Sequence, residues 1–184
     1  MFTKLATANP FTVGQDNFDT NDLYAFDEVQ DFVLTDALIA NLGLTNIAAG
    51  TRVNSHFVFF DPLPNATVQG SITFDTPVLA AITQRSTLIA SNYLGAAGIT
   101  YLDPGSVGLE PGIDFVTLGS PDANTLRINF LTTDSPGDHF RVITLAGPGA
   151  VPELQTWALM LAGVGLIGGV LRRRTGQAAK AIAA

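Results

Sequence analysis

Two histidines are the side chains in this sequence that are best suited by type to acid–base chemistry. His56 lies in an alternating stretch with phenylalanines, and Asp61 follows it, whereas His139 comes directly after Asp138. A histidine that contacts both a carboxylate and a hydroxyl can activate a nucleophile, as in a secreted hydrolase. The sequence contains no Gly-x-Ser-x-Gly, His-Glu-x-x-His or phosphate-loop motif to position such groups. We therefore predict two surface histidines and a protein that is not an enzyme.

An acidic segment without Lys or Arg contains Asp16, Asp19, Asp22, Asp27, Glu28 and Asp31. Outside the cell, carboxylates and turn carbonyls bind Ca²⁺, so Asp16, Asp19 and Asp22 are candidate calcium ligands. Their spacing matches neither an EF-hand nor a nonapeptide repeat, and solvated loop carboxylates are the alternative interpretation. Asp27 and Glu28 are adjacent on a predicted strand and point to opposite faces, so they predict no glycosidase pair. No cofactor is expected, and the absence of cysteine excludes a Cys-ligated zinc or iron–sulfur site.

Four aromatic residues are candidates for a face that binds glycans: Tyr24, Phe26, Tyr93 and Tyr101. Such a face needs exposed rings, and the same residues are equally suited to a buried core. Two interpretations therefore stay open at this point. One is a β-domain whose ligand the sequence does not identify, and the other is a glycan- or calcium-binding extracellular module.

The elements that must position these groups are predicted to be strands. Apolar and polar residues alternate with period two between residues 20 and 146, so that His139 and Arg141 take the face opposite Phe140. Candidate strands, separated by Gly, Pro and Asp turn signals, cover 22–26, 31–35, 51–60, 68–74, 77–82, 99–102, 113–118, 126–130 and 139–142. One short helix is predicted over 86–94, with Ser86 as its cap. The pattern predicts a mainly β fold, an antiparallel β-sandwich or jelly roll.

Composition and charge limit the class of protein further. The 184 residues are 47% apolar and 14% charged, which is enough apolar surface for one core and excludes a long disordered acidic chain. The net charge of −7 argues against a nucleic-acid partner. Residues 1–150 contain 15 acidic and five basic residues, whereas residues 151–184 contain one acidic and four basic residues. This asymmetry indicates a membrane or targeting tail.

The tail has the features of a membrane helix. Residues 156–171 are uncharged, and three arginines follow them. Pro152 and Glu153 suit the first turn of a helix, and Trp157 lies where an interfacial aromatic belongs. From Glu153 to the first arginine a helix would extend about 30 Å, the thickness of a hydrocarbon core. We predict a transmembrane helix, and a buried core helix is the alternative.

The tail also resembles a known sorting signal. Val151, Pro152 and Glu153, then Trp157 and a Gly-rich apolar stretch, then Arg172, Arg173 and Arg174 are similar to the PEP-CTERM tail of exported Gram-negative proteins. Leu154 stands where the family has its second proline. The resemblance implies recognition by an exosortase-type membrane enzyme that removes the helix. It also implies a cell-envelope protein, anchored in the inner membrane before processing, with extracellular polysaccharide as a partner.

The body adds a second resemblance. Segments such as Ser55-His-Phe-Val-Phe-Phe-Asp-Pro62 and Gly70-Ser-Ile-Thr-Phe-Asp75 are similar to an uncharacterised PEP-CTERM subfamily. That subfamily has no assigned activity, so this resemblance implies a location and a fold without a mechanism.

The predicted organisation has five parts. Residues 1–20 are a leader or loop, 21–146 the sandwich, 147–150 a linker, 151–174 the sorting signal with its transmembrane helix, and 175–184 a cytoplasmic tail. Arginines mark the cytoplasmic side of a membrane helix, so the body is predicted to lie outside. Export needs a signal peptide, yet no apolar segment follows Lys4, and we predict that the chain begins downstream of its natural start. The alternative is a cytoplasmic protein with a simple tail anchor.

Overall fold

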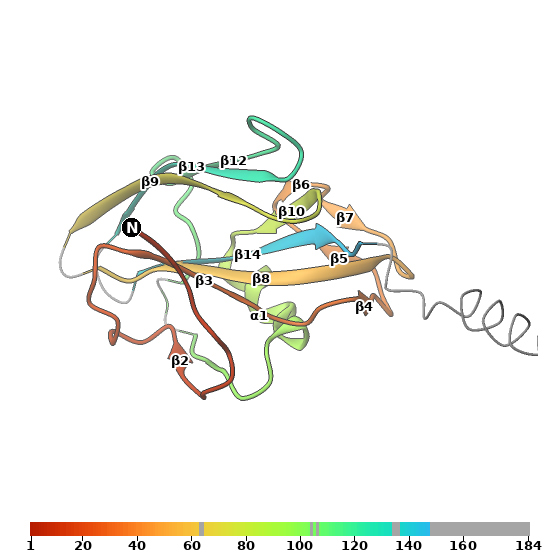
Figure 1. Cartoon of the computed structure of the whole chain (residues 1–184), viewed down its shortest axis with the longest axis horizontal. Helices are drawn as coiled ribbons and strands as arrows, with labels where there is room; N and C mark the ends of the chain where they lie inside the picture. The colour runs from red at the N-terminus through yellow and green to blue at the C-terminus, as the bar shows by residue number, and fades with distance from the viewer. Residues whose placement is uncertain (63–64, 104, 106, 134–136, 148–184) are drawn as a thin grey trace, which may run out of the picture. The chain divides into compact units, whose positions relative to one another are not determined.

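The computed structural model describes residues 1–62, 65–103, 105, 107–133 and 137–147. Its largest sheet comprises β1 (Phe2–Lys4), β3 (Leu23–Asp27), β4 (Phe32–Val33), β6 (Leu42–Gly43), β8 (Arg52–Phe60), β10 (Val78–Ile82) and β14 (Asp138–Leu145). The strand order is β1-β3-β8-β14-β10-β6, and β4 also pairs with β8 (Figure 1). Only the β1–β3 pair within this sheet is parallel.

A second sheet covers one face of the first. It consists of β9 (Ala66–Thr73), β12 (Phe115–Leu118) and β13 (Thr125–Thr133), all antiparallel with β13 in the centre. Figure 1 shows these strands as a separate layer above β8 and β14. One buried cluster joins the layers and includes Val58, Phe60 and Phe140 from below and Leu126 and Leu131 from above. Two sheets thus enclose a core, and the predicted mainly β fold is confirmed.

The opposite face of the larger sheet is also covered. The covering elements are β2 (Thr12–Val13), β5 (Leu38–Ile39), β7 (Asn46–Ile47), α1 (Arg85–Ala90), the short 3-10 helix η1 (Asn92–Leu94) and β11 (Thr100–Tyr101). In Figure 1, β2 and α1 lie on this side of β8. Together they bury a second cluster, in which Phe26, Phe57 and Phe59 of the sheet meet Leu88 and Leu94. Because both faces are covered, β14 is buried along nearly its whole length.

His139 and Arg141 depart from the prediction made for β14. They were expected on an exposed polar face, but they are 1% and 0% exposed. The alternation did separate the two faces correctly, since Phe140 packs between the sheets. The other face meets a second core instead of water, and the His139 ring lies against Phe57 and Phe59 with centroids 5.9 and 5.8 Å apart. Period two identifies the faces of a strand but not what covers them.

The predicted helix over 86–94 is divided into α1 and η1. Ser86 does not cap it, because α1 begins one residue earlier and its N-cap makes no side-chain cap bond. Instead, Asn41 Oδ1 accepts the backbone N–H groups of Thr83 and Gln84 at 2.9 and 3.0 Å. The donors that precede the first turn are therefore satisfied by a residue from a distant loop.

Residues 1–20, predicted to be a leader or loop, contribute two strands. β1 pairs in parallel with β3, β2 pairs in parallel with β11, and the Met1 ammonium lies 2.7 Å from Asp22 Oδ1. The strands predicted over 31–35 and 99–102 are only two residues long here, as β4 and β11. Residues 38–47 contain three short strands that the alternation did not indicate.

The chain divides into two units, Met1–Gly147 and Pro148–Ala184. The sorting signal at 151–174 and the cytoplasmic tail at 175–184 both fall in the second unit, outside the described residues. Within the part that the structure describes, no helix is long and apolar enough to cross a bilayer. The transmembrane helix stays a prediction.

Candidate functional site

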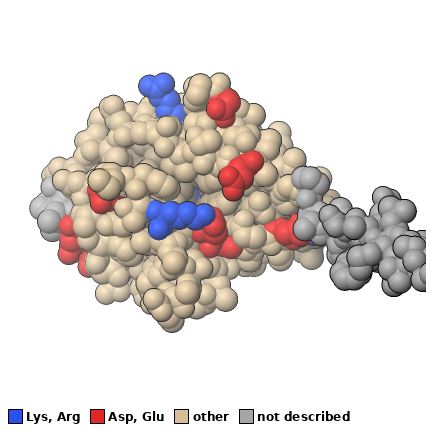
Figure 2. Space-filling view, viewed as in Figure 1, with Lys and Arg blue, Asp and Glu red and all other residues tan. Residues whose placement is uncertain are grey.

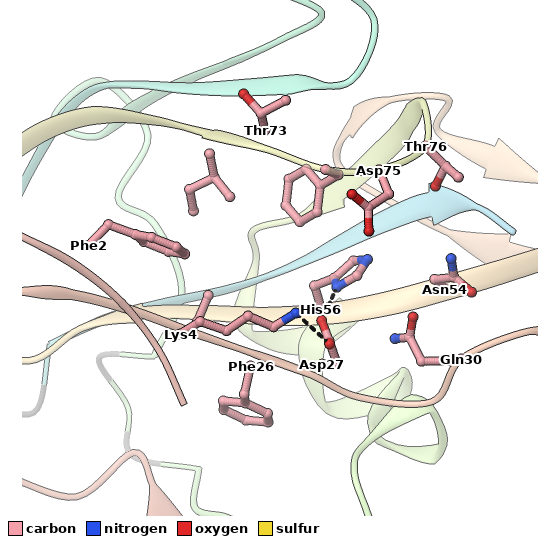
Figure 3. Close-up of a pocket in the computed structure, with 13 residues that line it drawn as sticks. Phe2, Lys4, Phe26, Asp27, Gln30, Asn54, His56, Thr73, Asp75 and Thr76 are labelled. Carbon is pink, nitrogen blue, oxygen red and sulfur yellow. Dashed lines mark hydrogen bonds and ion pairs between the residues drawn. The ribbon is translucent and has the colours of Figure 1, made fainter. Parts of the chain in front are cut away.

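A pocket of about 200 Å³ lies between the larger sheet and the end of β9 (Figure 3). Its hydrogen-bonding side chains are Lys4, Asp27, Gln30, Asn54, His56, Thr73, Asp75 and Thr76, and its lining also contains Phe2 and Phe74. Asn54 and His56 are two residues apart on β8 and share a face, as their alternation predicts. The register of the sheet places Asp27 directly opposite His56. The pairing of β1 with β3 then brings Lys4 to the same place.

These residues form a chain of polar contacts across the sheet. Asp27 Oδ2 lies 2.7 Å from the Lys4 ammonium, and Asp27 Oδ1 lies 2.8 Å from His56 Nδ1. On the other side of the ring, His56 Nε2 lies 3.2 Å from Thr144 Oγ1. Phe74 packs against the imidazole with ring centroids 4.7 Å apart. A carboxylate, an imidazole and a hydroxyl therefore lie in series.

The electrostatics of the pocket favour a neutral histidine. Burial lowers the pKa of His56, and the Asp27 carboxylate opposes this effect only in part. Burial acts to raise the pKa of Asp27, but hydrogen bonds from Lys4 and His56 outweigh it, and the pKa is lowered. An ionised Asp27 accepts the Nδ1–H of a neutral His56, which leaves Nε2 to accept the Thr144 hydroxyl.

The order of these groups is that of a general-base relay, but the hydroxyl at its end is enclosed. Thr144 is 0% exposed, in the middle of the larger sheet between β8 and β10. Thr144 does not line the pocket, which presents the Lys4 ammonium, the Asp27 carboxylate and the Asn54 amide to a ligand. The arrangement is suited to holding a polar ligand by hydrogen bonds.

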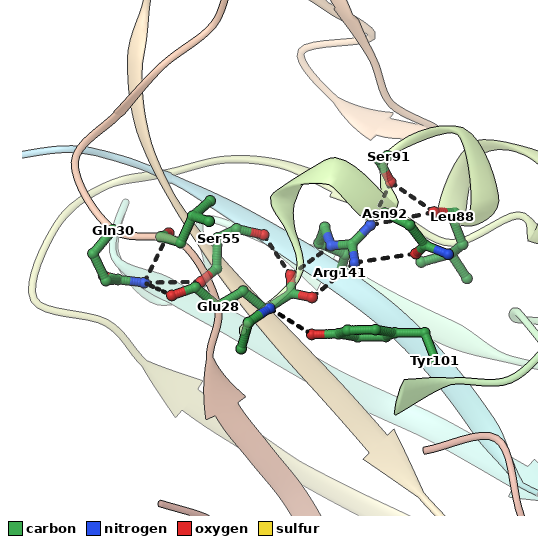
Figure 4. Close-up of polar contacts among 10 residues, drawn as sticks. Glu28, Gln30, Ser55, Leu88, Ser91, Asn92, Tyr101 and Arg141 are labelled. Carbon is green, nitrogen blue, oxygen red and sulfur yellow. Dashed lines mark hydrogen bonds and ion pairs between the residues drawn. The ribbon is translucent and has the colours of Figure 1, made fainter. Parts of the chain in front are cut away.

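A buried ion pair beneath the other face fixes the strands that carry the pocket (Figure 4). Arg141 on β14 donates through Nη2 to Glu28 Oε1 at 2.7 Å and through Nε to Glu28 Oε2, and both side chains are 0% exposed. The Ser55 hydroxyl on β8 also donates to this carboxylate, and Arg141 Nη1 reaches the Ser91 hydroxyl after α1. The guanidinium carbon lies 5.8 Å from the centre of the Tyr101 ring. This cluster ties β8, β14 and α1 together and faces away from solvent.

No family model matches the chain, and no curated protein or solved structure is significantly similar to it. The resemblance of the tail and body to PEP-CTERM proteins therefore stays a prediction.

The predicted calcium ligands do not form a single site. Asp22 is paired with the Met1 ammonium. Asp16 lies beside Asp19, where a hydrogen bond between the two carboxyl groups raises the pKa of Asp19. Asp61 holds the same loop, because its Oδ2 accepts the backbone N–H groups of Asn17 and Phe18 at 3.2 and 3.1 Å.

The predicted glycan-binding aromatics are mostly part of the core. Phe26 is buried, the Tyr24 ring stacks on Phe59 at 5.2 Å, and Tyr101 packs against the cluster around Phe57. Tyr93 is exposed and contacts Phe32. Of the four, Phe26 also lines the pocket at His56. The other two aromatic residues of that lining, Phe2 and Phe74, were not singled out by the sequence.

A different set of carboxylates lies close enough to hold a metal ion. Among the described residues, one oxygen each from Glu110, Asp114 and Asp138 lies within 4.8 Å of the others. Burial raises the pKa of Asp138 to about 8, with further increases from Asp114 and Glu110, while the Thr133 hydroxyl acts in the opposite direction. From the sequence, Asp138 was considered only as the neighbour of His139. No local pattern indicates that it lies near the loop at 110–114, because the two segments are far apart in the chain.

Proposed function

We propose that this chain is a cell-envelope protein whose β-domain is displayed outside the cytoplasm and whose residues 151–174 are a PEP-CTERM sorting signal. The observation that carries the proposal is the order of the tail: Pro152 and Glu153, then Trp157 and an uncharged stretch, then the arginines at 172–174. The β-domain is a binding or structural module in this proposal, without catalytic activity.

The division of the chain supports the proposal. The compact unit ends at Gly147, four residues before the signature begins. The last strand ends at Leu145, and the Ala146 N–H donates to the Arg52 carbonyl at 3.0 Å, so that the end of the domain is held within the sheet. Removal of the segment after Glu153 would therefore leave every strand pair of the described sheets intact. An exosortase-type enzyme in the inner membrane is the partner that this organisation requires.

Processing at the signature predicts a specific loss of mass. In a Gram-negative host that has the sorting enzyme, the mature protein is expected to end near Pro152 and Glu153, as peptide mass spectrometry of the purified protein would show. Glu153→Ala should leave the full tail in place and retain the protein in the inner-membrane fraction. Gln155→Ala, a neighbour outside the signature, is the matched control and should be processed normally. Identical masses for the native chain and Glu153→Ala would rule out sorting at this motif.

A second function, glycan binding, is favoured by the pocket at His56. Amide and carboxylate groups such as those of Asn54 and Asp75 match the paired hydroxyls of a sugar, and Phe74 offers an apolar ring for its face. Asn54 Oδ1 already accepts the Asp31 N–H at 2.8 Å, which fixes the orientation of the amide. In Figure 2 most of the visible face is uncharged. A neutral polysaccharide segment is the ligand that this pocket fits.

Substitution of Asn54 tests the glycan function. Asn54→Ala is expected to weaken binding of a neutral oligosaccharide roughly tenfold, the loss of about one hydrogen-bonded contact. Asp75→Ala should have a similar effect, and it removes no side-chain hydrogen bond among the described residues. Asn46→Ala, at the exposed position of strand β7, is the control. Ligand-observed NMR against a panel of neutral and acidic oligosaccharides provides the measurement, and equal binding by all four proteins would reject the pocket as the site.

A further inference from the structure

The carboxylate cluster of Glu110, Asp114 and Asp138 brings together two parts of the chain that are distant in sequence. Glu110 and Asp114 lie at the two ends of a tight turn before β12, in which the Asp114 N–H donates to the Glu110 carbonyl at 3.0 Å. Asp138 is the first residue of β14 and pairs with Phe60 of β8. The fold therefore places one carboxyl oxygen from each of three residues within 4.8 Å of the others.

Asp138 makes this cluster different from a group of solvated surface acids. Asp138 is 0% exposed, and neither oxygen of its carboxyl group has a hydrogen-bond partner among the described residues. A buried carboxylate without a partner is costly, because water no longer solvates it and no donor replaces that water. Both of its oxygens are free to act as ligands, and one of them lies within the cluster.

Asp114 is oriented by the backbone on both sides. Its Oδ2 accepts the Glu110 N–H at 2.8 Å, and its Oδ1 accepts the Thr132 N–H of β13 at 3.1 Å. Each oxygen keeps a lone pair that these bonds do not use. The carboxylate is thus held in place before any ligand arrives, as second-sphere hydrogen bonds hold the ligands of metal sites.

The cluster also has an opening to solvent. Glu110 is exposed, and Glu110 and Asp114 line a pocket of about 210 Å³ together with Thr83 and Gln84. An ion can enter from this side, and water can occupy the coordination positions that the protein leaves open.

We propose that Glu110, Asp114 and Asp138 bind a calcium ion. The ligand atoms are all carboxylate oxygens, which favours a hard divalent cation over zinc or copper. Calcium binds oxygen at about 2.4 Å, so two ligands on opposite sides of the ion lie roughly 4.8 Å apart, and the cluster falls within that limit. The site is separate from Asp16, Asp19 and Asp22 and does not depend on the sorting signal.

Calcium titration of the full-length protein in mild detergent, after dialysis against EDTA, tests the proposal. Isothermal calorimetry at pH 7.5 is expected to show one calcium per chain, with a dissociation constant of about 1 mM or tighter, as in extracellular calcium modules. With about 10 mM CaCl₂ the Tm should rise by roughly 5 °C when the constant is near 0.1 mM. MgCl₂ should produce a smaller response.

Three variants decide which residues hold the ion. Glu110→Gln, at the exposed edge, should keep the fold and weaken calcium binding more than tenfold. Asp138→Asn should abolish the calcium response and, in EDTA, should not lower the Tm, because a neutral amide is not destabilised by burial as a carboxylate is. Asp36→Asn, an exposed acid outside the cluster, should bind like the native chain. No calcium response at 10 mM, a response that survives in both Glu110→Gln and Asp138→Asn, or a stronger response to magnesium than to calcium would each overturn the proposal.

Discussion

Replacement of Arg141 by methionine is expected to lower the free energy of unfolding by about 3–5 kcal/mol. Methionine fills much of the same space, but it leaves the Glu28 carboxylate buried with its guanidinium partner removed. The Ser91 hydroxyl loses its bond to Arg141 at the same time. The loss is large because the remaining charge has no access to water, whereas an exposed pair would contribute 1 kcal/mol or less.

Urea unfolding followed by circular dichroism measures this change. Arg127→Met on the exposed face of β13 is the matched control and should alter stability by no more than about 0.5 kcal/mol. The double variant Arg141→Met with Glu28→Met removes both charges and should recover most of the loss. If Arg141→Met alone costs less than about 1 kcal/mol, the ion pair does not hold the sheet to α1 in the way described.

In EDTA, the stability of the native chain is expected to fall as the pH rises from 6.5 to 8. Burial, together with Asp114 and Glu110, raises the pKa of Asp138 to about 8 from an ordinary value of 3.8. Between these values the folded chain keeps a proton that the unfolded chain has released, so each increase in pH favours unfolding. The slope is at most about 1.4 kcal/mol per pH unit, or roughly 2 kcal/mol over this interval.

The pH interval is chosen to separate Asp138 from His56. The lowered pKa of His56 makes stability rise as the pH increases toward 6.5, which is the opposite sign, and that contribution is complete above its unfolded value. Urea unfolding at several pH values should therefore show a decline in the native chain and a flat profile in Asp138→Asn. A native profile that is flat or rising over the same interval would contradict the buried, unpartnered carboxylate.

The local pattern of the chain was sufficient to predict the strands with the strongest alternation. Residues 51–60 and 126–130 became β8 and β13 because period two is a property of neighbouring residues and requires no knowledge of the rest of the fold. The same pattern placed Asn54 and His56 on one face. It did not reveal the short strands in residues 38–47. Two residues are too few to show an alternation, and such strands form only where another strand pairs with them.

The tail is the part about which the sequence is most informative. An uncharged stretch, a flanking acid and three arginines are contiguous, so the prediction of a sorting signal and membrane helix needs only local composition. The predicted sorting function rests on these residues.

The polar sites, in contrast, were decided by tertiary structure. Asp27 meets His56 through strand register, Glu28 meets Arg141 across 113 positions of the chain, and Asp138 meets Glu110 because a turn before β12 approaches the start of β14. His139 and Arg141 were expected to face solvent and are buried, because the loops and α1 cover the second face of the sheet. Alternation depends only on adjacent residues, whereas burial and the pairing of charges depend on which distant segments pack together.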